Sequence, residues 1–286
     1  DRQGEVYHRY VLGLYDLMER LTERFPDVLF EGCSGGGGRF DTGMAYYMPQ
    51  IWTSDNTDAV ARLTIQYGTS LVYPISMTTA HVSAIPNHQT GRKTPFETRG
   101  NAAMSAVFGY ELDLTRMSQE DRDKVKEQVS CYKDIRKLVQ YGTFHRLKSP
   151  VDTNQAAWMF VSDDRRDVCV MTFQVLAFAQ PSLTKTKLTG LDPELEYENL
   201  ETGEIFGGDE LILRSCRSSG LHVENVPLQG TLEISEGGGK FCLRKRGDRD
   251  FPGFFFRMLK VSVRGWRPMC RELHFTVKTQ KPAFFP

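Results

Sequence analysis

The chain has 286 residues, of which 40% are hydrophobic and 25% are charged, and its formal net charge is zero. These values are typical of a globular chain long enough for one large domain or two ordinary ones. Residues 212–286 contain 14 Lys/Arg and 6 Asp/Glu, a net charge of +8, so the first 211 residues carry −8. An acidic body of this size argues against nucleic acid as the main partner.

Six cysteines are too few for a disulfide scaffold in a chain this long. The sequence has no Cys-x-x-Cys pair and no His-Glu-x-x-His segment, so we do not expect a metal site. The longest strongly apolar run, 168–179, is too short to cross a membrane. No signal peptide is visible, but this absence carries little weight. The sequence leaves the location unknown, and we favour a cytoplasmic over a secreted one. The chain begins at Asp1 without a start methionine, and we expect it to be truncated.

The N-terminal part of the chain predicts helices and a strand around a glycine loop. Apolar residues recur every three to four positions over Val6–Phe25, which indicates an amphipathic helix. Val28–Phe30 is typical of a short buried strand, and the glycines at 35–38 form the loop after it. Another helix is predicted to start at Asp58, which is spaced to form an i, i+4 ion pair with Arg62.

The pattern of strands and helices continues to residue 142. The next strand is either Leu71–Tyr73 or Thr78–Val82, followed by a helix over Glu97–Phe108. Alternating apolar residues over 110–114 indicate a strand, and a capping-box spacing opens a long helix over 118–141. Alternating strands and helices predict parallel βα units. These roughly 140 residues are about half of the ~250 that a (β/α)₈ barrel needs.

From Thr143 the pattern changes to β-rich runs separated by turn signals. The runs are Phe144–Leu147, Trp158–Val161, Val168–Phe178 and Lys187–Leu191. They predict a small antiparallel β-sandwich over 143–211. Residues 212–286 form an atypical basic tail with three of the six cysteines and the cluster Phe254–Phe256. This tail is either the product of a reading-frame shift, which we favour, or a genuine appended module.

The candidate site lies in two neighbouring loops. Cys33, Ser34 and four consecutive glycines follow an apolar stretch, so the backbone there must approach something closely at the end of a strand. Trp52 and Asp55 lie in the next unit and place an aromatic ring and a carboxylate in one loop. Such a combination is typical of a site that hydrolyses sugars.

Each of these residues also has a purely structural interpretation. An aspartate just before a helix, such as Asp55, is usually an N-cap, and Trp52 is equally suited to a core. The glycine run does not fit a dinucleotide fingerprint, because Phe40 stands where Gly or Ala is needed. His81 and His88 have an unhelpful spacing for a metal and are better suited to hydrogen bonding with loop backbone.

Several motifs resemble those of glycoside hydrolase family 36, the bacterial and fungal α-galactosidases, and they occur in the family's order over about three quarters of the chain. They are the Cys33–Gly38 block, Trp52–Ala59, Gln66–Ser70, Ala80–Ser83, Pro86–Arg92 and, more weakly, Gly207–Leu211. The resemblance implies an α/β fold, namely the second half of a (β/α)₈ TIM barrel over residues 1–142, followed by the β-sandwich. Strands five to eight of the barrel would be those present.

The resemblance also implies roles for site residues. Asp55 matches the general acid/base, and Cys33 and Gly36 match residues that contact galactose, with Trp52 as an aromatic wall beside them. Asp58 matches a second acid, for which we expect a structural role. The family's nucleophile is the Asp of a Lys-Trp-Asp segment, which none of the three tryptophans of this chain forms.

By this resemblance, the parent protein is expected to be an α-galactosidase that removes terminal galactose from melibiose- and raffinose-type oligosaccharides with retention, without a metal or cofactor. The isolated chain is expected to be inactive because it lacks the nucleophile. A galactosyl transferase and a non-catalytic sugar-binding remnant are the alternatives. The expected partner is the oligosaccharide rather than nucleic acid or a membrane, and the full-length enzyme is expected to be a homo-oligomer.

Overall fold

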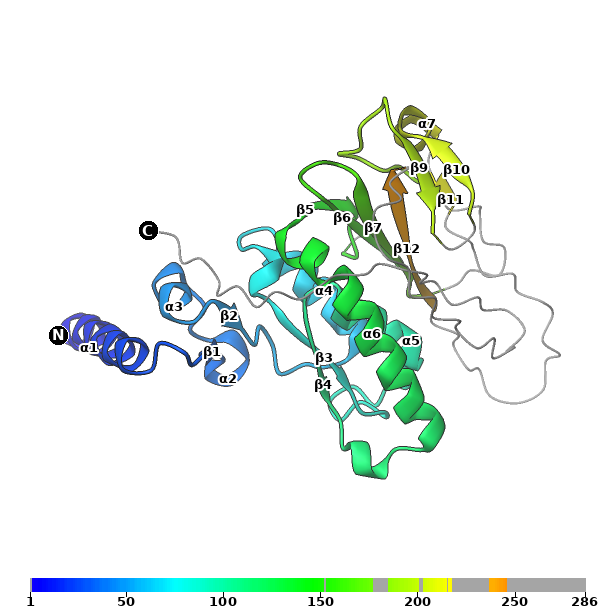
Figure 1. Ribbon diagram of the computed structural model, residues 1–286. Helices are drawn as coiled ribbons and strands as arrows, with labels where there is room; N and C mark the ends of the chain where they lie inside the picture. Colours follow the sequence, from blue (N-terminus) through cyan, green and yellow to red (C-terminus); the bar gives the residue numbers. More distant parts are fainter. Residues whose placement is uncertain are drawn as a thin grey trace.

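The computed structural model describes residues 2–151, 153–176, 185–200, 203–214, 216–217 and 237–245 (Figure 1). The cluster Phe254–Phe256 and most of the basic tail therefore lie outside the described residues. The described part is an α/β structure with mixed helices and strands.

The N-terminal segment forms one long helix followed by short elements. They are α1 (Gln3–Arg24), β1 (Glu31–Gly32), α2 (Ser34–Gly37), α3 (Thr42–Tyr47) and β2 (Gln50–Ile51). The predicted first helix is confirmed. The strand predicted at Val28–Phe30 is wrong, because Val28 and Leu29 are exposed and pairing begins only at Glu31. Apolar character alone placed that strand too early in the chain.

The central part alternates helices with two further strands. Its elements are α4 (Ala59–Thr69), the 3₁₀ turn Ile75–Met77, β3 (Thr79–Ser83), α5 (Phe96–Met104), β4 (Val107–Glu111), the 3₁₀ turn Leu114–Arg116 and α6 (Gln119–Tyr141). Of the two strands considered, the one near Thr78–Val82 is confirmed, whereas Leu71 and Val72 are exposed. Ser118 caps α6 as predicted, since its hydroxyl accepts from the Asp121 amide at 3.1 Å.

The four N-terminal strands run parallel. β1 pairs with β2, and β3 pairs with β4 over five residue pairs. A single parallel bridge between Ile51 and Thr78 connects the two pairs. The spatial order is therefore β1, β2, β3, β4, with helices between the strands in sequence, as the predicted βα units require. This arrangement brings the carboxyl ends of β1 and β2 together.

The second part of the chain is an antiparallel sheet, drawn at the upper right of Figure 1. Its strands are β5 (Thr143–Lys148), β6 (Gln155–Val161), β7 (Asp167–Gln174), β9 (Glu196–Asn199), β10 (Ile205–Gly207) and β12 (Gly237–Lys245), in the spatial order β10-β9-β12-β7-β6-β5. β8 (Lys185–Thr186) pairs separately with β11 (Cys216–Arg217), and α7 (Gly208–Arg214) follows β10. The strand predicted at Lys187–Leu191 does not form. Only the short strand β8 lies directly before this segment.

The sheet includes a segment from beyond residue 211. The backbone of β12 pairs antiparallel with β7 on one side and with β9 on the other. The expected boundary at residue 211 stays a prediction, but the sheet of the described structure takes one of its inner strands from the basic tail.

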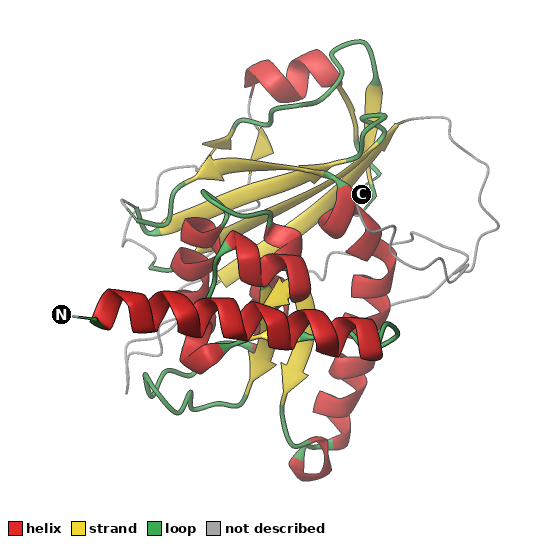
Figure 2. Cartoon of the chain, turned by 90° about the vertical axis from the view of Figure 1, so that its left-hand side faces the viewer, coloured by secondary structure: helices red, strands yellow, loops and turns green. Residues whose placement is uncertain are grey.

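The core joins the parallel strands to the antiparallel sheet. One cluster contains Val82 from β3, Ile135 from α6 and Trp158 and Phe160 from β6, all at most 1% exposed. The alternate residues of β6, such as Met159, face a second cluster on the other side of the sheet. Figure 2 shows helices packed beneath the sheet on the side of β3 and β4.

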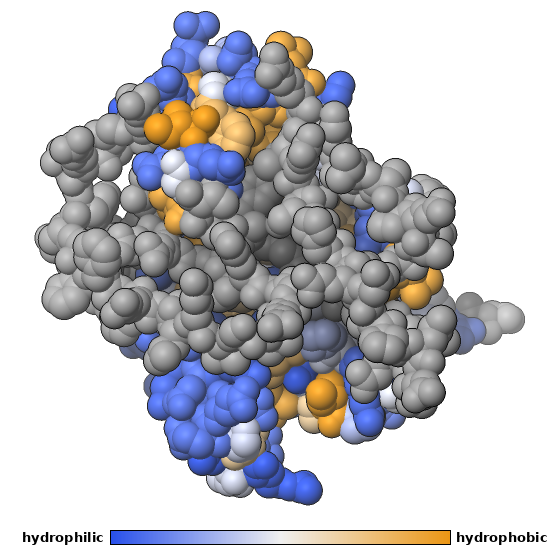
Figure 3. Space-filling view, turned by 90° about the vertical axis from the view of Figure 1, so that its right-hand side faces the viewer, coloured by the Kyte–Doolittle hydropathy of each residue, from blue (hydrophilic) through white to orange (hydrophobic). Residues whose placement is uncertain are grey.

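The outer surface has both hydrophilic and apolar regions (Figure 3). In the described part of the chain, no helix is both long and apolar enough to span a membrane. Figure 3 shows that hydrophilic side chains gather at the lower end of the molecule on the face it presents. α1, in contrast, exposes apolar side chains over much of its length, namely those of Val6, Tyr7, Tyr10, Val11, Leu12 and Leu17.

Candidate active site

Asp55 lies in the loop that connects β2 to α4. The Trp52 amide donates to the Gly32 carbonyl at 2.7 Å, so the pairing of β1 with β2 continues to the start of this loop. Two short turns then shape the loop, because the Asn56 amide donates to the Ser54 hydroxyl and the Asp58 amide to the Asn56 side chain, each at 3.1 Å. Asp55 is exposed at the carboxyl ends of the strands, where ligands of α/β folds bind.

Asp58, and not Asp55, is the N-cap of the following helix. Its carboxylate accepts from the Ala61 amide at 3.2 Å and pairs with Arg92. The ion pair expected between Asp58 and Arg62 is wrong, because Arg62 turns toward backbone carbonyls instead. The structural role expected for Asp58 therefore holds with a different partner. Asp55 is therefore not the N-cap of α4, and its carboxylate does not bond to the helix N-terminus.

The Trp52 ring contacts three functional groups. Its Nε1 donates to the Asp55 Oδ1 at 3.2 Å. The His81 ring lies 4.6 Å from the indole, measured between ring centroids, and the Arg62 guanidinium lies 5.2 Å from the indole centroid. Trp52 is only half-buried, so it does not belong to the core. A hydrogen bond to loop backbone was expected for His81, but its ring instead lies against the indole, with the two ring planes inclined at 35°.

The glycine loop winds the opposite way from an ordinary helix. Ser34, Gly35, Gly36 and Gly37 all have φ between 57° and 89°, and the Gly37 amide donates to the Cys33 carbonyl at 2.7 Å. This left-handed backbone favours glycine, since a Cβ in that region costs about 1–2 kcal/mol per residue. The loop after β1 therefore requires glycines for its shape.

Two of these glycines also lie against the Asp55 loop. A Cβ on Gly36 would stand 2.9 Å from the Asp55 amide nitrogen, and one on Gly37 would stand 2.9 Å from the Thr53 carbonyl oxygen. The absence of side chains thus lets the two loops touch, as the sequence predicted for a closely approached backbone. Cys33 begins the turn, and its thiol is free and exposed. The structure therefore brings Gly36, Trp52 and Asp55 together and places Cys33 on the same loop as Gly36.

A further loop supports the site, although the sequence analysis placed none of its residues there. The Asn87 side chain, 4% exposed, donates to the Thr57 hydroxyl at 3.0 Å, and the Gln89 side chain accepts from the Thr57 amide at 3.2 Å. The Ser83 hydroxyl donates to the Thr57 carbonyl at 3.0 Å. The motif Pro86–Arg92, noticed only as part of the resemblance, therefore holds the end of the Asp55 loop.

Burial shifts the pKa values of two side chains that contact the Trp52 ring. Burial lowers the pKa of His81, and Arg62 acts in the same direction, while Glu31 and Glu111 oppose the shift. Burial also lowers the pKa of Arg62 to about 10, so its guanidinium still carries its charge at neutral pH. Within the described residues, no group of three or more His, Cys, Asp or Glu side chains is arranged to hold a metal ion.

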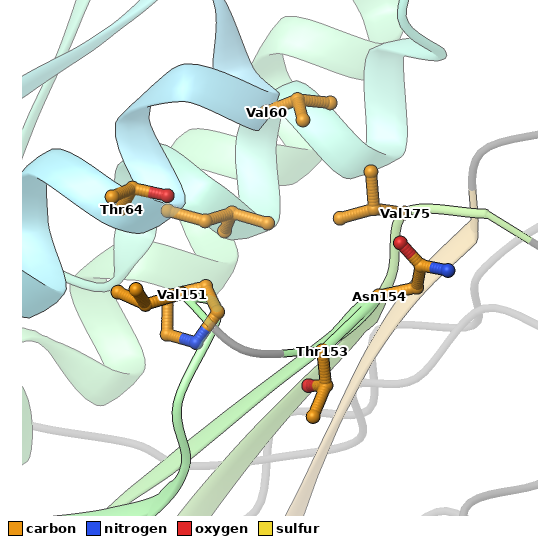
Figure 4. A pocket seen from close by; sticks show the side chains of 8 residues that line it. Val60, Thr64, Val151, Thr153, Asn154 and Val175 are labelled. Carbon is orange, nitrogen blue, oxygen red and sulfur yellow. The ribbon is translucent and has the colours of Figure 1, made fainter.

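A separate hollow of about 590 Å³ lies between α4 and the loop before β6. Figure 4 shows Val60 and Thr64 from α4 facing Val151, Thr153, Asn154 and Val175 across it. None of the residues that line it is ionisable, so it offers no acid, base or charged nucleophile. It shares no residue with the Asp55 site.

Comparison with known proteins identifies the family. Residues 1–142 match the Melibiase family, and residues 155–215 match the C-terminal domain of glycosyl hydrolase family 36. The chain belongs to glycoside hydrolase family 36. The resemblance seen in the sequence is thereby confirmed. Solved structures of this family support an α/β fold with a TIM barrel and a C-terminal β domain.

Relatives in family 36 match most of this chain but contain much more. The chain is 68% identical over 212 residues to α-galactosidase 1 of Pediococcus pentosaceus and 63% identical over the same length to Mel36A of Lactobacillus acidophilus. Those matches cover 74% of this chain but 29% of each relative. The chain thus spans less than a third of their length.

Solved structures give the same picture. The structure of α-galactosidase AgaA from Geobacillus stearothermophilus superposes with a TM-score of 0.78 at 53% identity, over 85% of this chain and 32% of AgaA. The α-galactosidase from Lactobacillus brevis superposes with a TM-score of 0.79 at 41% identity, over 89% of this chain and 34% of that protein.

Proposed function

We propose that this family 36 chain supplies the acid/base half of the active site of a retaining α-galactosidase. The observation that carries the proposal is the grouping around Asp55. Its carboxylate is exposed, receives a hydrogen bond from the Trp52 indole and lies against the side-chain-free Gly36. A carboxylic acid beside an aromatic wall and a bare backbone suits a sugar ring whose glycosidic oxygen must be protonated.

In the proposed reaction, Asp55 gives its proton to the glycosidic oxygen as the bond to the leaving sugar breaks. A second carboxylate attacks the anomeric carbon from the other side and forms a covalent galactosyl intermediate. Asp55, now ionised, takes a proton from water, which displaces the second carboxylate and releases galactose with its configuration retained. Cys33, Gly36 and Trp52 are the proposed contacts to the galactose ring. The second carboxylate must come from outside this sequence, which has no Lys-Trp-Asp segment.

The proposed substrates are oligosaccharides with a terminal non-reducing α-galactose, of the melibiose and raffinose type. Variants of AgaA from Geobacillus stearothermophilus have been solved with raffinose and with stachyose, which supports this class for a chain that is 60% identical to AgaA over 212 residues. The proposed chemistry uses carboxylates and water and requires no metal or organic cofactor.

The same proposal covers the finer architecture. We assign β1 to β4 to strands five to eight of a (β/α)₈ barrel over residues 1–142, because they are parallel, ordered along the chain and separated by helices. Residues 143–211 are proposed as a small β-sandwich domain, supported by apolar clusters on both faces of β6 and β7. Residues 212–286 are proposed as an atypical tail. Assembly of the complete enzyme into a homo-oligomer is also proposed.

A chimera tests the proposal. The stretch of AgaA that matches this chain over 212 residues is replaced by the matching part of this chain, and hydrolysis of raffinose is measured. We expect an active chimera, in which Asp55→Asn lowers kcat by about 10²–10⁴-fold, the usual contribution of general acid–base catalysis. The loss should be smaller with an activated aryl galactoside, whose leaving group needs little protonation. Asp123→Asn, at an exposed site on α6, is the matched control and should change little.

Two results would contradict the proposal. In a folded chimera, an Asp55→Asn variant as active as its parent would remove Asp55 from the chemistry. Hydrolysis of raffinose by the isolated chain would show that the chain has a nucleophile of its own.

A further inference from the structure

We propose that Arg62 is a positioning residue for Asp55, acting through the Trp52 indole. Arg62 is 2% exposed on α4, in the helix directly after the Asp55 loop. The inference rests on the proposed function only in giving Asp55 a catalytic task. The geometric relationship among Arg62, Trp52 and Asp55 can be tested without any activity.

The hydrogen bonds of Arg62 link the Asp55 loop to the strands. One guanidinium nitrogen donates to the Ser54 carbonyl at 3.3 Å, directly before Asp55 in the chain, and another donates to the Thr79 carbonyl at the start of β3. The third, Nε, donates to the Gln66 side chain at 3.3 Å. The planar fork of an arginine can reach all three directions at once, which a lysine ammonium on its flexible stem cannot.

The guanidinium also fixes the ring that holds the Asp55 carboxylate. It lies 5.2 Å from the Trp52 ring centroid, and the indole Nε1 donates to Asp55 at 3.2 Å. The attraction between a cation and an aromatic ring grows when the cation is removed from water, as Arg62 is. One side chain therefore holds both the backbone before Asp55 and the indole that binds its carboxylate.

The cost of this arrangement also favours a positioning role. Every hydrogen bond that Arg62 donates goes to a neutral oxygen of a carbonyl or an amide, and its remaining contact is an aromatic ring. Burying a charge without an opposite charge is expensive, and an apolar residue of similar size is often at least as stabilising. A buried cation at this place is thus better explained by the geometry it imposes than by stability.

Arg99 provides a matched control in the same chain. It is also buried, donates to the Thr94 and Ser83 carbonyls, and lies 5.0 Å from the Phe96 ring centroid. Its contacts are with Thr94, Ser83 and Phe96 and not with the residues of the Asp55 loop, which distinguishes it from Arg62. Substitution at Arg99 therefore shows what the loss of a buried arginine does to the fold in general.

The experiment follows the Trp52 indole N–H in ¹⁵N NMR spectra of the full chain. The chain has three tryptophans, so Trp52→Phe assigns the resonance, and Asp55→Asn identifies the part of its pH dependence that comes from the Asp55 carboxylate. In Arg62→Met we expect most of this pH-dependent shift to be lost. Arg62→Lys should restore part of it, and Arg99→Met should keep it. The Trp158 indole, which donates to Ser105 in the core, reports whether each variant is folded.

Three results would overturn the inference. The first is a Trp52 shift in Arg62→Met that follows pH as in the parent. The second is an equal loss in Arg99→Met, which would mean general loosening. The third is loss of the Trp158 signal in both Arg62 variants, which would make Arg62 a folding residue. The proposed function can fail independently, if the chimera is active but insensitive to Asp55→Asn while the NMR coupling persists.

Discussion

Gly36 and Asp55 touch through their backbones: a Cβ on Gly36 would stand 2.9 Å from the Asp55 amide nitrogen and 3.3 Å from its Cγ. The two residues come from different loops, after β1 and after β2. No flexible side chain lies between them that could move aside to make room for a Cβ on Gly36. The glycine therefore determines where the Asp55 carboxylate lies relative to the strands. This contact makes Gly36→Ala the most informative single substitution in the glycine run.

We expect Gly36→Ala to damage the site more than Gly35→Ala. Both residues have positive φ, 78° and 68°, so each alanine costs about 1–2 kcal/mol in backbone energy. At Gly35 nothing lies within 4 Å of the added Cβ, whereas at Gly36 the Asp55 backbone must move. Urea unfolding of the two variants and their effect on raffinose hydrolysis by the chimera check this expectation. Equal effects of the two substitutions on both measurements would contradict it.

Substitutions at Asp58 distinguish the contribution of its N-cap to stability from that of its ion pair with Arg92. Asp58→Ala removes both the bond to the Ala61 amide and the pair with Arg92, and we expect a loss of about 2 kcal/mol in the free energy of unfolding. Asp58→Ser retains a capping oxygen and should recover about 1 kcal/mol of this loss. Arg92 is partly exposed, so water can solvate it when its partner is removed. If serine is no better than alanine at this position, the cap contributes little and the ion pair dominates.

His81 and His145 make the stability dependent on pH. Burial lowers the pKa of both histidines below 6.5 in the folded state. As the pH falls below 6.5, the unfolded chain binds protons that the folded chain does not, so stability is complete above that pH and decreases below it. Urea unfolding at pH 7.5 and 5.5 measures the decrease. His81→Phe keeps an aromatic ring against Trp52 and should reduce the decrease, and adding His145→Phe should reduce it further. An unchanged decrease in the double variant would show that other groups cause it.

Much of the fold was accessible from the sequence because local signals there are strong. The apolar spacing of the first helix placed both ends of α1 within three residues, and the Ser118 cap placed those of α6 within one. Val28 and Leu29 misled the prediction, because they are apolar yet exposed, and an isolated sequence cannot show which apolar runs find a partner. The pairing of β12 between β7 and β9 joins residues distant in the chain, which no local pattern encodes.

The candidate site, too, has features that the sequence predicted and features that depend on the fold. Motif spacing drew attention to Gly36, Trp52 and Asp55, and the structure brings them together. The observed roles of Arg62 and Asn87 were not predicted, because they lie in contacts with carbonyls and with Thr57, which depend on the fold and not on residue type. The spacing of Asp58 and Arg62 predicted an ion pair, but Arg92 from another loop competes successfully for Asp58. Helical spacing makes a pair possible without deciding it.

A buried hydrogen bond lies at the junction between α5 and the antiparallel sheet. The Trp158 indole, 1% exposed, donates to the Ser105 hydroxyl at 3.0 Å, directly after α5. Ser105→Ala leaves this buried donor without its acceptor, so we expect a loss of about 1–3 kcal/mol in the free energy of unfolding. Trp158→Phe removes the donor along with some buried surface. Once it is made, adding Ser105→Ala should cost much less than Ser105→Ala does alone, because no donor is left unsatisfied. A double-mutant cycle by urea unfolding measures this coupling; strictly additive losses would mean that the hydrogen bond does not hold the helix to the sheet.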